Sequence, residues 1–176
     1  MRSFALVLPM LCLMLFSCQN TARIENGKLL LEINKKMESR VNYAEKGSKQ
    51  LMKRFTPSEY LVCRHSEIRD FAVRDSKVLS IDDGFGKGKK TIIRGVAIQK
   101  DIKIEKILTL AVYDSFPDMA FINVRYINAG KHNVEIMKWV NQAYDIDDNG
   151  DSPAFWSFQG SSTGARMDWI LPVDSS

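Results

Sequence analysis

The chain has few of the residues that build cross-linked or metal-centred folds. It contains three cysteines and two histidines in 176 residues, and no His-x-x-x-His or Cys/His grouping joins His65 to His132. This scarcity argues against a disulfide framework and against a zinc site. We therefore expect neither a metal nor a cofactor.

Long apolar runs are also missing, except at the start. Phe4–Phe16 is almost continuously apolar behind Arg2. A transmembrane helix needs about 20 apolar residues, so this shorter run is typical of a secretory signal. The pair Ser17-Cys18 resembles the bacterial lipoprotein box, which implies a signal peptide at residues 1–17 and a diacylated Cys18. It also implies a location in the cell envelope of a Gram-negative bacterium, with lipid as the only membrane contact. A plain signal peptide with an incidental Cys18 is the alternative.

An extreme charge balance is absent too. The 25 basic and 21 acidic residues give a formal net charge of +4 and a pI of about 8.9, short of a nucleic-acid-binding signature. A hydrophobic content of 45% is typical of one globular domain. A (β/α)8 barrel needs about 250 residues and does not fit. Residues from Asp145 onward carry −5 and residues 18–144 carry +8, which predicts two unequal surfaces.

The strongest pattern in the remaining chain has a period of two, which predicts strands. In residues 101–113 the even positions are apolar, with Lys106 as the exception. We expect this strand to form an antiparallel meander with strands at 119–128 and 134–144, separated by turns at 114–118 and 128–131. Further strands are expected at 28–34, 59–65, 68–75 and 91–99, with a glycine-rich hairpin loop at 82–88. A helix is conceivable only at 47–55.

These elements predict an all-β sandwich of antiparallel strands. No repeat and no polar low-complexity linker divides it. We expect a tether at residues 18–26 and one sandwich domain at residues 27–173.

Three local motifs have simpler interpretations than the chemistry they first indicate. Asp145–Asp151 is similar to the start of a calcium loop, but Trp156 occupies the position of the bidentate Glu and Pro153 interrupts the exit helix. A solvated acidic turn is the better interpretation. Gly84–Thr91 lacks the spacing of a phosphate loop and predicts a hairpin with solvating lysines. Cys63 lies in an apolar stretch and is expected to be a buried, inert thiol.

The most distinctive segment lies at residues 152–173, where aromatic rings stand beside amide, hydroxyl and guanidinium groups. Aromatic faces stack on sugars, while glutamine and arginine bond sugar hydroxyls. The residues that we expect to face a sugar or a neighbouring domain are Trp156, Gln159, Arg166, Asp168 and Trp169. The alternative is that the rings close the edge of the sandwich.

Several of these segments together resemble one known domain. The segments are Ile104–Leu110, Val112–Ala120, Val124–Gly130, Phe155–Gly160 and Asp168–Pro172. They resemble the N-terminal β-supersandwich of glycoside hydrolase family 36-type α-galactosidases, as found in lipoproteins of gut-type Bacteroidetes. The resemblance covers Gly27–Val173 and implies a galactose mutarotase-like supersandwich.

Enzymes of that family cleave terminal α-linked galactose with retention, using two aspartates in a following barrel, one of them in a Lys-x-Asp motif. No Lys-x-Asp occurs here, so no catalytic residue is assigned. The resemblance implies a non-catalytic domain that braces an absent barrel and lines its sugar site, with residues 174–176 starting the linker. The expected partners are that barrel and a galactose-containing oligosaccharide, without nucleic acid. A stand-alone glycan-binding surface lipoprotein and a structural envelope lipoprotein are the rival hypotheses.

Overall fold

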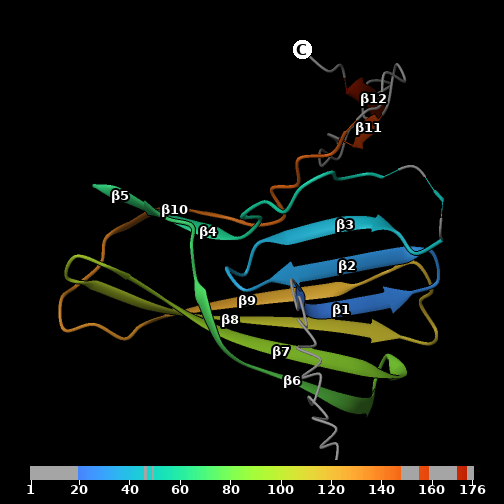
Figure 1. Ribbon diagram of the computed structural model, residues 1–176, viewed down its shortest axis with the longest axis horizontal. Coiled ribbons are helices and arrows are strands. Elements are labelled where there is room, and N and C mark those ends of the chain that lie inside the picture. The colour runs from blue at the N-terminus through green and yellow to red at the C-terminus, as the bar shows by residue number, and fades with distance from the viewer. Residues whose placement is uncertain (1–19, 46, 49, 148–154, 159–169, 174–176) are drawn as a thin grey trace, which may run out of the picture.

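The computed structural model describes residues 20–45, 47–48, 50–147, 155–158 and 170–173. Within these residues every regular element is a strand, and all the sheets are antiparallel (Figure 1). The all-β prediction is confirmed, and the arrangement is consistent with a β-sandwich. A helix able to span a membrane is not found in this part of the chain.

The largest sheet contains four long strands in the order β6-β7-β8-β9. They are β6 (Ala72–Asp83), β7 (Gly86–Gln99), β8 (Ile102–Tyr113) and β9 (Phe121–Asn128). Strands β6 and β7 are joined by a tight turn, and Gly86 leaves that turn at a φ of 105°, a conformation that L side chains rarely adopt. In β8 the even positions from Ile104 to Leu110 are buried, as the period predicted.

Three smaller sheets complete the described structure. One has the order β1-β2-β3, formed by β1 (Asn20–Asn26), β2 (Leu29–Asn34) and β3 (Ser39–Tyr43). A second has the order β10-β4-β5, formed by β4 (Tyr60–Cys63), β5 (Ser66–Ile68) and β10 (Ile136–Val140). The third is a hairpin of β11 (Phe155–Phe158) and β12 (Ile170–Val173).

One hydrophobic core joins the large sheet, the β1-β2-β3 sheet and the β10-β4-β5 sheet. Leu31 of β2, Leu61 of β4, Ile93 of β7 and Leu108 of β8 belong to a single buried cluster, and Phe71 reaches it from the segment before β6. Burying one such side chain stabilises the fold by about 1.5–3 kcal/mol. No backbone ladder joins these three sheets in the described residues. Side-chain packing joins them, together with single hydrogen bonds such as that from the Val73 N–H to the Lys35 carbonyl at 3.0 Å.

The predicted meander is only partly correct. Strands β8 and β9 form the expected hairpin, but β10 is shorter than predicted and pairs with β4, placing Trp139 opposite Leu61. The chain crosses to the other sheet after β9, and Val134 packs against the core on the way. A period of two predicts that a segment is a strand, but it does not predict which strand is its partner.

Three other boundaries differ from the expected ones. Residues 47–48 and 50–55 contain no helix, because the Met52 N–H donates to the Asn42 side chain and the Leu51 carbonyl accepts from Asp147. The strand expected at 68–75 is divided between β5 and β6, with buried Phe71 between them. Residues expected as a tether form β1, which pairs with β2 and buries Ile24.

Candidate functional site

Most of the residues predicted from the sequence to form a site lie outside the described residues. This applies to Cys18, Gln159, Arg166, Asp168 and Trp169. The backbone of Trp156 lies in β11 opposite Pro172, but its side chain is outside the described part. The candidate surfaces below are therefore those of the described residues between 20 and 147.

The first candidate surface is an aromatic cluster at one end of the large sheet. It combines Phe85 from the β6–β7 turn, Tyr113 from the end of β8, Phe116 from the following loop and Phe121 from the start of β9. Their ring centroids lie between 5.4 and 6.4 Å apart. Tyr113 is buried, whereas Phe85 is 54% exposed and presents its ring to solvent. Such a ring is a platform on which a flat apolar face can stack.

Asp83 fixes the position of this cluster. Its carboxylate accepts hydrogen bonds from the Tyr113 hydroxyl and from the Phe85 backbone N–H, each at 3.0 Å. Burial and, to a smaller extent, the bond to Asp83 raise the pKa of Tyr113, so its hydroxyl stays protonated at neutral pH. The turn and its ring are thereby anchored to β8.

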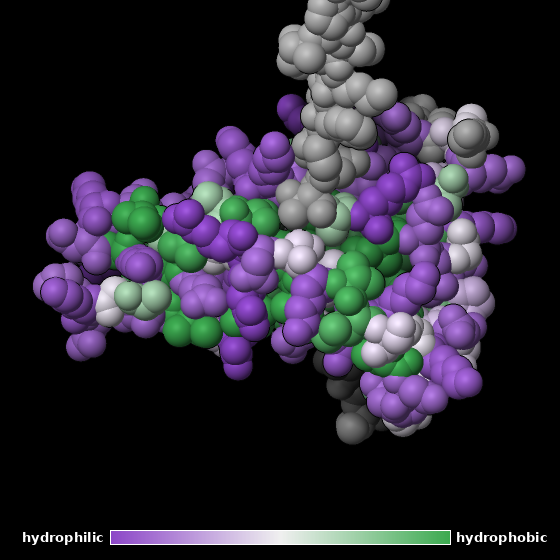
Figure 2. All heavy atoms as spheres, turned by 60° about the horizontal axis from the view of Figure 1, so that its bottom comes forward, coloured by the Kyte–Doolittle hydropathy of each residue, from purple (hydrophilic) through white to green (hydrophobic). Residues whose placement is uncertain are grey.

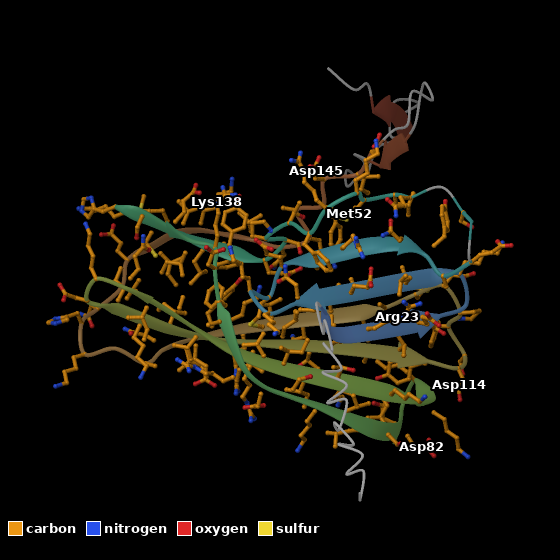
Figure 3. The ribbon with its side chains drawn as sticks, in the orientation of Figure 1. Arg23, Met52, Asp82, Asp114, Lys138 and Asp145 are labelled. Atoms are coloured by element: carbon orange, nitrogen blue, oxygen red, sulfur yellow. The ribbon has the colours of Figure 1, made fainter. Side chains whose placement is uncertain are left out.

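A depression of about 440 Å³ lies at the same end of the sheet. Asp82 and Asp114 both point out at this end, although one belongs to β6 and the other follows β8 (Figure 3). The backbone N–H of Asp114 donates to the Lys87 carbonyl at 2.9 Å, which brings the two segments together. The depression is lined by the acidic residues Asp82 and Asp114 and by the basic residues Lys87 and Lys89. These side chains offer both hydrogen-bond donors and acceptors.

The second candidate is a buried ion pair between the large sheet and the segment before β4. The Lys106 ammonium donates to the Glu59 backbone carbonyl at 2.7 Å and lies 3.4 Å from the Glu59 carboxylate. Both side chains are almost completely buried, and the Phe71 ring centroid lies 5.3 Å from the ammonium. Desolvation lowers the pKa of Lys106, while the charge of Glu59 opposes that shift.

The signal for this pair was present in the sequence. Lys106 is the one polar residue on the apolar face of the segment predicted as a strand, and that position placed it in the core. Its partner could not be predicted, because Glu59 lies 47 residues away. Tyr126, opposite Lys106 on β9, has a buried hydroxyl without a hydrogen-bond partner. Burial raises the pKa of Tyr126, and the charge of Glu59 adds to the shift. With side chains 0% and 2% exposed, the two residues of this pair form a buried structural contact.

The third candidate is the exposed apolar surface of β10. Trp139 is 68% exposed, and Met137 and Ile136 are also largely exposed. Trp139 lies directly opposite Leu61, and opposed residues of an antiparallel pair share one face of the sheet. Trp139 therefore lies on the same face of the sheet as buried Leu61, but other residues do not cover it.

The acidic turn and the thiol have structural surroundings. Asp145 pairs with Arg54 and Asp147 with Lys53, so the described part of this turn is engaged by basic neighbours. Burial raises the pKa of Cys63, which disfavours the reactive thiolate. Within residues 20–147, where described, no group of three or more metal-ligating side chains occurs.

No protein-family model, no curated protein and no solved structure matches this chain.

Proposed function

We propose that this chain is the non-catalytic N-terminal sandwich of an α-galactosidase-like glycoside hydrolase, and that it braces a catalytic barrel. The antiparallel all-β architecture agrees with the resemblance of Gly27–Val173 to that domain. The observation that carries the proposal is the exposure of Trp139 on the core-facing side of its sheet. Tryptophan, with tyrosine and arginine, is enriched among the residues that anchor protein interfaces. The surface of β10 is thus the proposed contact with the barrel.

The test starts from the DNA around the coding region, where we expect an in-frame or neighbouring barrel with a Lys-x-Asp strand end. The barrel and the chain are co-expressed, and hydrolysis of a chromogenic α-galactoside is measured. We expect the chain alone to give no turnover, and Trp139→Ser to lower the yield of active barrel several-fold. Ile98→Ser is the matched control, because Ile98 is similarly exposed, at 66%, but lies on β7. Turnover by the chain alone, or no barrel in that region, would refute the proposal.

Attachment to the envelope through Cys18 is part of this proposal. Export followed by acylation would leave the sandwich tethered beside the membrane. Metabolic labelling with a palmitate analogue tests it, and Cys18→Ser should abolish the label. A labelled Cys18→Ser protein would show that this assignment is wrong.

A second candidate function, glycan binding without hydrolysis, is favoured by the end of the large sheet. Phe85 offers an exposed ring, and the depression at the same end of the sheet is lined by Asp82, Asp114 and two lysines. Stacking and hydroxyl recognition are the two components of sugar binding. Titration with raffinose, followed by NMR, should shift the signals of the β6–β7 turn in the wild type but not in Phe85→Ala. Ile98→Ala is the control, and unshifted wild-type signals would remove this candidate.

A further inference from the structure

Strand β6 forms an open edge of the large sheet. It is 12 residues long and pairs with β7 on one side, and no strand of the described residues pairs with its other side. Such an edge presents a row of backbone N–H and C=O groups that can pair with another strand. Apolar surface is visible between charged side chains on the side of the molecule where β6 lies (Figure 2).

The ladder between β6 and β7 is regular over the second half of β6. A register shift occurs between Val73 and Asp75, and from Asp75 to Asp83 each residue has one partner on β7. Side chains therefore alternate strictly between the two faces of this part of the strand. One face carries, in order, Lys77, Leu79, Ile81 and Asp83.

This order is self-complementary. Read along the strand, the four side chains are a cation, two aliphatic groups and an anion. If a second identical strand runs antiparallel beside the first, with Ser80 opposite Ser80, then Lys77 faces Asp83 of the other copy and Leu79 faces its Ile81. Both contacts occur twice, because the dyad repeats them. Opposite charges and aliphatic pairs directly across an antiparallel ladder are stabilising.

We propose that two copies of this chain associate through β6, in antiparallel register centred on Ser80, to form a continuous eight-stranded sheet. The exposed aliphatic group on this face fits this occupant, since Leu79 is 38% exposed in the single chain. The Asp83 carboxylate already accepts hydrogen bonds from the Tyr113 hydroxyl and the Phe85 N–H, so its position is fixed before the second copy arrives. One strand pair is a small interface, and the dimer is accordingly weak.

The experiment is sedimentation equilibrium on the purified full chain, in reducing buffer, from about 1 μM to 1 mM. The wild type should change from monomer to dimer over this range. Lys77→Glu and Asp83→Lys each place like charges opposite one another twice and should raise the dimer dissociation constant about tenfold or more. Lys103→Glu makes the same change of charge on an exposed side chain of β8 and should have no effect.

Mixing the two variants gives the decisive result. In a mixed pair the reversed residue of each variant faces the unlike charge of the other, so equimolar Lys77→Glu and Asp83→Lys should associate as tightly as the wild type. Hydrogen exchange of the wild type provides a second measurement that needs no variant, and amides in residues 77–83 should be better protected at the higher concentration. A wild type that stays monomeric, a dimer unaffected by Lys77→Glu, or folded variants that fail to associate when mixed would each overturn the proposal.

Discussion

Removing the ammonium group of Lys106 should strongly destabilise the fold. The variant Lys106→Met keeps most of the aliphatic stem but deletes the charge-assisted bond to the Glu59 carbonyl at 2.7 Å. It also leaves the Glu59 carboxylate without its cation in a site where that side chain is 2% exposed. Breaking one side of a buried ion pair costs about 3–5 kcal/mol, since an uncompensated charge remains in the interior.

A double-mutant cycle separates the pair from its surroundings. Lys106→Met/Glu59→Gln removes the orphaned charge, so we expect it to recover at least about 1–2 kcal/mol of the loss. Lys103→Met is the matched control on the same strand, and because Lys103 is exposed its effect should stay within about 0.5 kcal/mol.

Urea denaturation followed by circular dichroism measures these free energies of unfolding. For a chain of this size each kcal/mol also corresponds to about 2–4 °C in Tm, so Lys106→Met should melt at least about 6 °C below the wild type. A loss below about 1 kcal/mol, or a double variant whose loss equals the sum of the single losses, would show that the pair does not stabilise the junction between the sheets.

Two further predictions concern Tyr126 and Gly88. Tyr126→Phe should leave the free energy of unfolding unchanged or raise it by up to about 1 kcal/mol, since the buried hydroxyl has no partner; a loss above about 1 kcal/mol in urea denaturation would contradict this. Because burial raises the pKa of Tyr126, the wild type has its full stability below pH 10 and loses stability as the pH rises further; Tyr126→Phe should reduce that loss. Gly88→Ala should cost about 1–3 kcal/mol, since a Cβ there would overlap the Val112 carbonyl, whereas Gly84→Ala, with open space around it, should not lower the Tm.

Local patterns in the sequence predicted the strands better than their partners. The alternation in residues 101–113 identified β8 because one face of that strand is buried, and its single exception, Lys106, is a buried ion. The same alternation could not place β10, since the pairing of Trp139 with Leu61 depends on a crossing between sheets.

The candidate surface was likewise predicted only where it depends on neighbouring residues in the sequence. A glycine-rich hairpin was predicted at residues 82–88, and β6 and β7 do turn there. The aromatic cluster on that turn was not predicted, because Phe85 and Phe121 meet only when the two hairpins lie side by side. The length of β6 was also missed, since the few apolar residues of its exposed second half lie on both faces and give no period of two.

The pairing of β10 with β4 has a consequence for the order of folding. Ile136 and Cys63 are opposed in this ladder although about 70 residues separate them along the chain. The intervening hairpins of the large sheet close much shorter loops, so they can form while the two ends are still apart. We therefore expect the large sheet to form first and β10 to dock late. Docking does not cover Trp139, which is 68% exposed in the folded chain, so its ring is available to a neighbouring chain before and after that step.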